Sequence, residues 1–252
     1  MGIFNIEVFL LVLTRIASFF VVTPLFSSKN IPAILKIGFS FLITILVMLI
    51  MPNMSIEVKT SIGYYFLIMK EAIIGLFIGY ISYLIFSSIQ MAGQLADRQV
   101  GFSMAESYDP MTNIRSAAYG NIYNWISICL FLGVNAHHYL ISGIVKSFQW
   151  APLGAASLLK VNVGDVVTIF SQSFLTAFQI AVPTIIVIFM ADVIMGMIAR
   201  TVPQINVFIL GMPLKVIIGF LVFLILVPSL GNMMISVIEE IPLILNKLVR
   251  LL

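Results

Sequence analysis

The chain has 252 residues, of which 61% are hydrophobic and 9% are charged, and its formal net charge is +3. A soluble domain carries about 25% charged residues, so a soluble fold of this length would lack the polar surface that must cover its core. Acids and bases are scattered, without the clustered Lys and Arg of a nucleic-acid surface. Composition therefore argues against a soluble enzyme and a nucleic-acid-binding protein, and it predicts a membrane-inserted helical protein.

Six apolar stretches predict helices, because a chain inside lipid must satisfy its own backbone hydrogen bonds. In chain order they are Ile6–Phe26, Ile37–Met51, Ile62–Met91, Ile122–Val145, Val166–Ile198 and Val207–Val227, the last of which Pro228 is expected to end. A short amphipathic tail, Ile241–Leu252, is expected to lie on a membrane surface or on a partner. The predicted fold class is all-α.

Several of these stretches are poorly suited to simple membrane crossing. Ile37–Met51 has 15 residues, which as a helix reach about 22 Å against a hydrocarbon core of about 30 Å. Pro183 interrupts the fifth stretch and Pro213 the sixth. Charged residues also lie inside the apolar stretches, namely Arg15, Lys70, Glu71, Asp192 and Lys215. A charge at the bilayer centre costs about 2.5–3.5 kcal/mol, so we expect these side chains to face protein or water.

The distribution of basic residues does not orient the chain. If all six stretches crossed, the loops on each side would hold five Lys and Arg residues. One side would have Lys59, Lys146, Lys160, Lys247 and Arg250, and the other Lys29, Lys36, Arg98, Arg115 and Arg200. The positive-inside rule needs an imbalance, so this pattern favours an arrangement other than a six-span bundle.

The longest polar interval runs from Gln90 to Asn121, and we call it the central loop. Its glycines, its mixed charges and Asp109-Pro110 predict a helix end followed by a structured loop. Methionines and a tyrosine lie among its polar residues, and flexible Met side chains can close a pore and then yield. The residues by themselves support a pore-closing loop and an ordinary surface loop equally.

No sequence motif indicates catalysis. The chain has no HExxH, GxSxG, GxxxxGK[ST] or GxGxxG, so we expect neither a catalytic site nor a cofactor. His137 and His138 are adjacent, and neighbouring residues on a helix point about 100° apart. A shared metal is therefore disfavoured, and a helix-end or core polar role is expected.

Two further pairs of residues favour structural roles. Gly75 and Gly79 form a GxxxG pattern, which permits close contact between helices. Asp192 and Arg200 are two helical turns apart. They are expected to pair with each other or with other groups, and a proton relay is the less favoured alternative.

Short segments at a characteristic spacing extend along nearly the whole chain. They are RIASFF from Arg15, Pro24-Leu25-Phe26, Lys36-Ile37-Gly38, QVGFS from Gln99 with Gly101 and Phe102, Asp109-Pro110, Asn135-Ala136-His137, RTVPQINVF from Arg200 with Pro203 and Asn206, and GMPLK from Gly211 with Pro213 and Lys215. In this combination the chain resembles the FliR/SctT family of type III secretion export-gate proteins. Ala136 stands where the family commonly has glycine.

The resemblance implies a particular fold and setting. Residues 1–165 would form a FliP-like helical part that includes the central loop (about 90–121). Residues 166–252 would form a FliQ-like helical hairpin and tail. These membrane-inserted hairpins would complete a helical ring with FliP-like and FliQ-like subunits, in the bacterial inner membrane within the flagellar basal body.

The resemblance also implies a function. The chain would be a core, non-enzymatic subunit of the flagellar type III export gate, which forms and closes the channel for unfolded flagellar subunits. The expected partners are FliP-like, FliQ-like, FlhB-like and FlhA-like proteins, transiently exported chains and membrane lipid, without nucleic acid.

In the family, the loop that matches Met104–Tyr119 helps to plug the pore. The expected pore and plug residues are Met104, Tyr108, Asp109, Pro110 and Met111. The expected structural or subunit-contact residues are Arg15, Pro24, Gly75, Gly79, Gln99, Gly101, Phe102, Asn135, His137, Asp192, Arg200, Pro203, Asn206, Gly211, Pro213 and Lys215. Gln94, Asp97 and Arg98 would lie near subunit contacts or the channel.

The alternative function is a secondary transporter or a channel for a small solute. Pro183 and Pro213 would break helices, and Asp192 and Lys215 would supply ionisable groups at the midplane. Such a transporter is expected to show an internal repeat, and the sequence contains no convincing one. Solute uptake by the purified protein in vesicles would distinguish the two functions.

Overall fold

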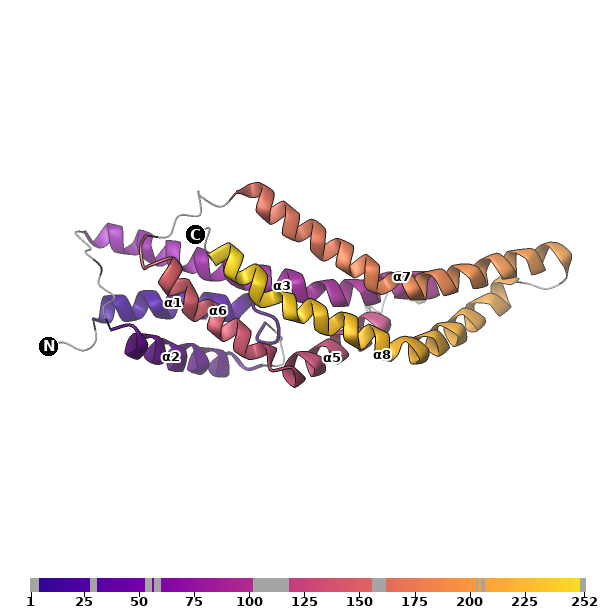
Figure 1. Cartoon of the computed structure of the whole chain (residues 1–252), viewed down its shortest axis with the longest axis horizontal. Helices are drawn as coiled ribbons and strands as arrows, with labels where there is room; N and C mark the ends of the chain where they lie inside the picture. Colours follow the sequence, from indigo (N-terminus) through magenta and orange to yellow (C-terminus); the bar gives the residue numbers. More distant parts are fainter. Residues whose placement is uncertain are drawn as a thin grey trace, which may run out of the picture. The chain divides into compact units, whose positions relative to one another are not determined.

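The chain is built from helices, and its structure is a computed structural model that describes residues 5–27, 31–52, 56, 60–101, 118–155, 162–202, 204 and 207–249. The helices are α1 (Ile6–Val22), α2 (Ala33–Ile50), α3 (Ser61–Val100), α5 (Ala118–Gly133), α6 (Ala136–Trp150), α7 (Val163–Thr201) and α8 (Val207–Val249) (Figure 1). The described residues contain no strand, which confirms the all-α prediction.

Within the described residues, four helices are long and apolar enough to cross a membrane: α2, α3, α7 and the Leu210–Lys247 part of α8. The pair α5 and α6, bent by 72°, would add a fifth crossing. α1 has 17 residues, fewer than the roughly 20 that a span usually needs. α2 has 18 residues because it begins just after Pro32, so the predicted start at Ile37 was wrong. The expected membrane-inserted helical protein is confirmed, with four or five candidate spans.

Two further predicted helix boundaries were wrong. The stretch Ile122–Val145 is not one helix, because Asn135 has a left-handed backbone (φ 55°) between α5 and α6, and a left-handed residue cannot continue a right-handed helix. Pro228 does not end the sixth stretch, because α8 continues to Val249 and includes most of the amphipathic tail. Neighbouring groups can compensate for proline inside membrane helices, so proline is a weaker stop signal there.

The chain divides into two compact units, each assembled from distant stretches. Unit 1 comprises Met1–Ile85, Asn135–Ile169 and Glu239–Leu252, and unit 2 comprises Phe86–Val134 and Phe170–Ile238. Helices α3, α7 and α8 therefore contribute residues to both units. The division at residue 165 concerns likeness to partner subunits and remains a prediction.

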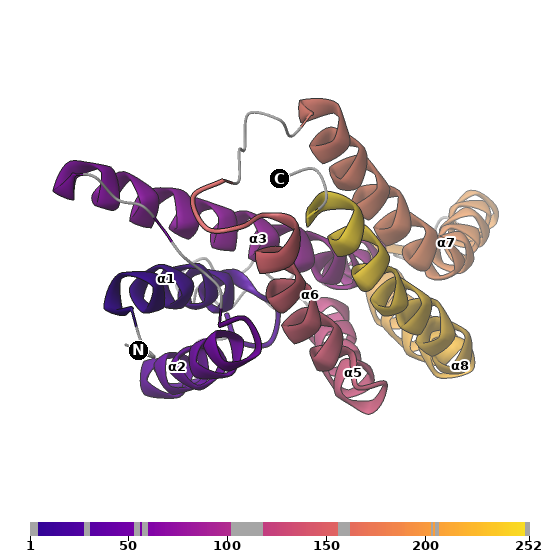
Figure 2. The same ribbon diagram turned by 60° about the vertical axis from the view of Figure 1, so that its left-hand side comes forward.

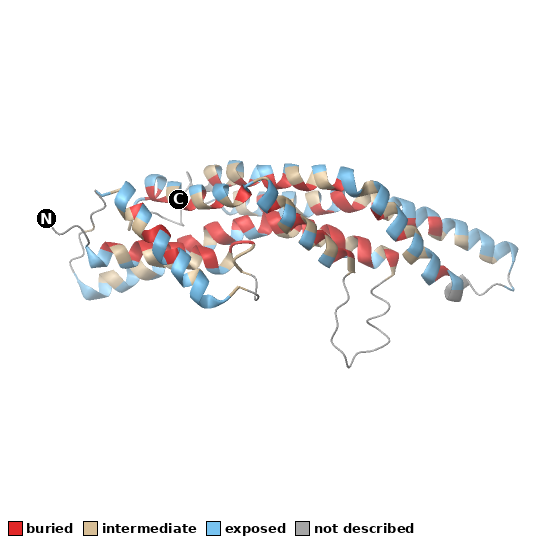
Figure 3. Cartoon of the chain, turned by 90° about the horizontal axis from the view of Figure 1, so that it is seen from below, coloured by how far each residue is buried: buried red, intermediate tan, exposed pale blue. Residues whose placement is uncertain are grey.

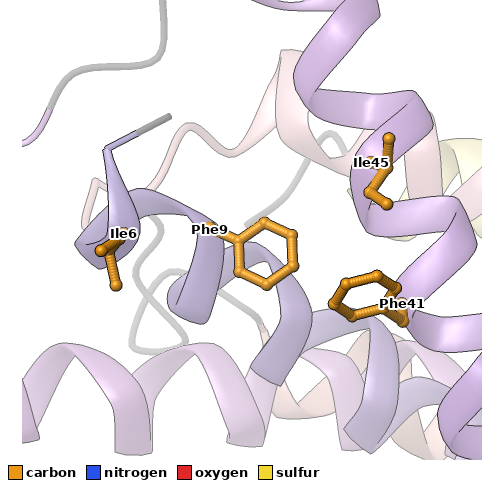
Figure 4. A pocket seen from close by; sticks show the side chains of 4 residues that line it. All are labelled: Ile6, Phe9, Phe41 and Ile45. Carbon is orange, nitrogen blue, oxygen red and sulfur yellow. The ribbon is translucent and has the colours of Figure 1, made fainter. Parts of the chain in front are cut away.

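In unit 1, α1 and α2 lie side by side (Figure 2). The rings of Phe9 and Phe41 meet edge to face with their centroids 5.4 Å apart. Together with Ile6 and Ile45 they line a wholly apolar pocket (Figure 4). The pocket offers no polar group for orienting a ligand, so it supports no chemistry.

The helices differ sharply in how much of their surface the chain covers (Figure 3). In the most apolar window of α3, 61% of the residues are buried, whereas the corresponding shares are 22% for α2, 28% for α7 and 17% for α8. Exposed residues on these three helices include Phe39, Phe189 and Leu224. Such extensive apolar exposure requires cover by lipid or by other proteins.

Candidate functional site at the end of helix α3

A buried ion pair joins α1 and α3 within unit 1. Arg15 and Glu71 are both completely buried, and Arg15 Nε lies 2.5 Å from a Glu71 carboxylate oxygen. The Arg15 guanidinium also donates to the carbonyl oxygens of Ser147 (3.2 Å) and Ala151 (2.9 Å). Its central carbon lies 4.4 Å from the ring centre of Phe148. These two charges in apolar helices therefore face protein, as their insertion cost predicts.

The same region of α3 holds the turn that follows α6. The second Glu71 oxygen accepts a hydrogen bond from the Gly154 N–H (3.1 Å), and Lys70 Nζ donates to the Gly154 carbonyl (2.7 Å). Gly154 has a left-handed φ of 75°, which glycine adopts at little cost. Arg15 donates to two carbonyls at the end of α6, and one of them, that of Ser147, also accepts from the Ala151 N–H at 2.9 Å. This network therefore joins three helices of unit 1.

A second polar cluster lies in unit 2 around the C-terminal end of α3. Asp192 of α7 forms an ion pair with Lys215 of α8. The side-chain amide of Gln99 donates to the other Asp192 oxygen at 3.5 Å. About a third of the Asp192 side chain and a quarter of the Lys215 side chain remain exposed. The partner of Asp192 thus comes from another helix, which settles the open question of its pairing in favour of Lys215 over Arg200.

Asp97 connects the end of α3 to the start of α5. Its side chain is almost completely buried, and its two carboxylate oxygens accept hydrogen bonds from the N–H groups of Tyr119 (2.8 Å) and Gly120 (2.9 Å). These N–H groups belong to the first turn of α5, where a helix has no internal acceptors. Negative charge is also favoured there by the helix dipole.

The main chain of Asp97 contributes to the same junction. Its carbonyl accepts a hydrogen bond from the Gly101 N–H at 3.1 Å. Gly101 has a φ of 98° and follows the last residue of α3, which is a common way for a helix to end. One residue therefore holds both helix ends between which residues 102–117 of the central loop lie. We call Asp97, Val100, Gly101, Tyr119 and Gly120 the loop base.

The loop base is closely packed. A Cβ atom on Gly93 would lie 2.7 Å from both the Gly120 Cα atom and the Tyr119 carbonyl oxygen. On α8, a Cβ atom on Gly219 would lie 2.8 Å from the Tyr119 hydroxyl and 3.1 Å from the Val100 side chain. The Tyr119 ring also lies against two phenylalanine rings of α8, at centroid distances of 5.9 Å for Phe220 and 5.8 Å for Phe223. Helices α3 and α5 therefore meet here almost backbone to backbone, and α8 packs against the side chains of Tyr119 and Val100.

Several residues named from the sequence gather at this place, whereas others do not. Gln99, Gly101, Asp192 and Lys215 all lie near the C-terminal end of α3. The plug residues Met104, Tyr108, Asp109, Pro110 and Met111, together with Phe102, Pro203 and Asn206, lie outside the described residues. Their assignments remain predictions.

The remaining predicted residues are dispersed. Pro24 is buried in the turn after α1, Asn135 lies at the break between α5 and α6, and His137 is in the first turn of α6. Arg200 is exposed in the last turn of α7. Gly211 and Pro213 lie in α8, and Gly75 and Gly79 lie where α3 approaches α1.

Sequence reasoning did not single out the role of Asp97. One signal was present, because an acid near the C-terminal end of a helix is opposed by the helix dipole. An acid at that position implies donors from another segment. Gly93, Tyr119 and Gly219 carried no such signal, since their importance lies in distances between helices.

The fold and these buried polar junctions define a helical membrane protein whose exposed apolar helices need external cover. Comparison with known proteins gives the family. The family described as "Bacterial export proteins, family 1" matches residues 6–241, so the chain belongs to this family.

The related proteins include several flagellar biosynthetic proteins named FliR. The chain is 38% identical to FliR of Bacillus subtilis over 224 residues, which cover 86% of this chain and 85% of that protein. It is 30% identical over 236 residues to FliR of Buchnera aphidicola subsp. Acyrthosiphon pisum, covering 92% and 90% of the two chains. It is 25% identical over 243 residues to FliR of Escherichia coli, covering 92% of this chain and 93% of that protein. The resemblance stated from the sequence motifs is confirmed.

Proposed function

We propose that this chain is a core subunit of the flagellar type III export gate, where it forms and closes the channel for unfolded flagellar subunits. The observation that carries the proposal is the family match over residues 6–241, together with relatives named for flagellar biosynthesis. Export of an unfolded chain needs a conduit and a seal. It needs no nucleophile or cofactor in this subunit.

The uneven burial of the helices supports a subunit that works inside an assembly. The apolar faces of α2, α7 and α8 are mostly uncovered by the chain itself. In the proposal, FliP-like and FliQ-like subunits cover much of this surface and lipid covers the rest. FlhB-like and FlhA-like proteins are further partners, and the assembly resides in the inner membrane within the flagellar basal body.

The loop base supports a role in closing the channel. Asp97 ties the end of α3 to the start of α5, so the two helix ends that flank residues 102–117 are held at a defined separation. A pore-closing loop needs such fixed ends, because a seal must return to one position after each passage. This favours the plug over an ordinary surface loop.

Co-purification tests the assembly. An affinity-tagged chain, expressed from its own locus in cells that are building flagella, is expected to bring down FliP-like and FliQ-like subunits as one complex in mild detergent. A single particle species that contains all three proteins would support the proposal. A monodisperse and functional particle made of this chain alone would refute it.

Shortening the central loop tests the seal. Deleting Met104 to Met111 should make the assembled gate leak ions, because the side chains proposed to fill the pore are lost. Single-channel or vesicle conductance of the purified complex measures the leak. A control variant carries a Gly-Ser segment of the original length, which separates the loss of these side chains from the loss of chain length. Unchanged conductance in the deletion would remove the plug assignment.

A further inference from the structure

We propose that Asp97 is a positioning residue for the closed gate, because its carboxylate sets the start of α5 against the end of α3. This inference rests on the proposed function, since it concerns how the closed state of that gate is maintained. Asp97 would not line the channel. It would act through the N–H groups of Tyr119 and Gly120.

The surroundings of the carboxylate indicate that it serves α5 and not its own helix. Asp97 lies in the last turn of α3, where the exposed carbonyl ends of the helix disfavour an acid. Its side chain is only 4% exposed, and a buried carboxylate is costly unless hydrogen bonds compensate. Both of its oxygens obtain that compensation from the first turn of α5.

The packing at the loop base is so close that α5 can move little without losing its hydrogen bonds to Asp97. Gly93 brings the backbones of α3 and α5 into direct approach, and Gly219 of α8 lies close to the Tyr119 hydroxyl and the Val100 side chain. N–H···O bonds weaken steeply with distance and angle. A shift of α5 by about 1 Å would therefore break both bonds to Asp97. The position of α5 in this structure and the intact carboxylate contacts are thus linked.

The start of α5 and the rest of that helix are held by different contacts. The two Asp97 carboxylate oxygens bind the first turn of α5. Farther along, α5 is held by apolar contacts of its own, such as the edge-to-face contact between Phe131 and Phe86 of α3 at 5.7 Å. Tyr123 likewise stacks on Phe223 of α8 at 6.0 Å. Loss of the carboxylate should release the start of α5 and leave the rest in place.

The test compares ion leak through the purified, assembled complex for three variants. Asp97→Ala removes both acceptors. The variant is expected to assemble as abundantly as the unmodified complex. Its leak conductance should rise roughly fivefold, because this is the ratio expected for loss of a helix N-cap. Asp97→Asn keeps one acceptor oxygen and should give a smaller rise. Ser82→Ala is the matched control, because this buried α3 hydroxyl donates within its own helix, to Ile78, and its conductance should not change.

Each outcome is decisive. Suppose that the Asp97→Ala complex assembles and conducts no more than the unmodified complex, while the Met104 to Met111 deletion leaks. This result would overturn the role of Asp97 and leave the proposed function intact. If neither the Asp97→Ala complex nor the deletion variant leaks, the assignment of the central loop as a plug is wrong as well. If Asp97→Ala does not assemble, Asp97→Asn decides by the same criterion. Failure of both to assemble would also overturn the proposal, because Asp97 would then be needed for folding.

Discussion

Replacing Arg15 with alanine is expected to abolish the folded protein in the membrane. The substitution leaves the Glu71 carboxylate buried without its cation, and breaking a buried ion pair from one side costs about 3–5 kcal/mol. It also removes the donor to the carbonyls of Ser147 and Ala151. This loss is comparable with the total stability of many proteins, about 5–15 kcal/mol. The amount of monodisperse protein after mild detergent extraction measures the effect.

Exchanging the two charges tests the cause. Arg15→Glu combined with Glu71→Arg restores an ion pair but places a carboxylate against the carbonyl oxygens at the end of α6. We therefore expect no rescue. Lys247→Ala is the control, because its ion pair with Asp165 is exposed and spans 4.0 Å, and such pairs contribute about 0–1 kcal/mol. Full recovery in the exchanged variant would show that the contacts with α6 contribute little.

Gly75→Ala is expected to destabilise the protein clearly, although it adds only a methyl group. The new Cβ would overlap the Arg15 carbonyl group and the Ser18 hydroxyl. The carbonyl belongs to the backbone of α1, so relief requires α1 to move as a whole. Overpacking costs about 1–3 kcal/mol, and here the movement also pulls Arg15 away from Glu71, one turn before Gly75 on α3. The melting temperature of the purified complex should fall by several degrees.

A second glycine supplies the control for this substitution. Gly38 lies inside α2, and a Cβ there meets nothing within 4 Å. Gly38→Ala should therefore be neutral or stabilising, because alanine is favoured over glycine in a helix by about 1 kcal/mol. Equal melting temperatures for the two alanine variants would contradict the proposed close approach of α1 and α3.

The sequence predicted that the chain forms helices better than it predicted where each helix begins and ends. Apolar stretches in a chain with few charges predicted helices, because lipid leaves the backbone no other hydrogen-bonding partner. Besides the start of α2, two boundaries were predicted wrongly, for identifiable reasons. Pro228 proved compatible with a continuous α8, and Asn135 ended α5 by adopting a left-handed conformation that glycine marks more clearly in a sequence.

The candidate site was predictable only in its separate parts. Gln99, Asp192 and Lys215 stood out as polar residues of matching motifs or apolar helices, but nothing in their spacing joined them. The sequence left open whether Asp192 pairs with Arg200 or with another group, and the approach of α7 to α8 selected Lys215. Asp97 appeared only as one polar residue among several near the central loop, until the first turn of α5 gave it donors.

The sequence by itself determined the class of this protein, its insertion in a membrane and its membership of an export family. Composition and the order of short motifs are properties of the chain that do not depend on how it folds. Only the tertiary structure decided which charge neutralises which, and which residue holds the loop base. Those choices depend on helices meeting at hydrogen-bonding distance, as Arg15 and Glu71 do across 56 positions of sequence. No local periodicity encodes such a meeting, because it is set by how apolar faces and glycines let the helices pack.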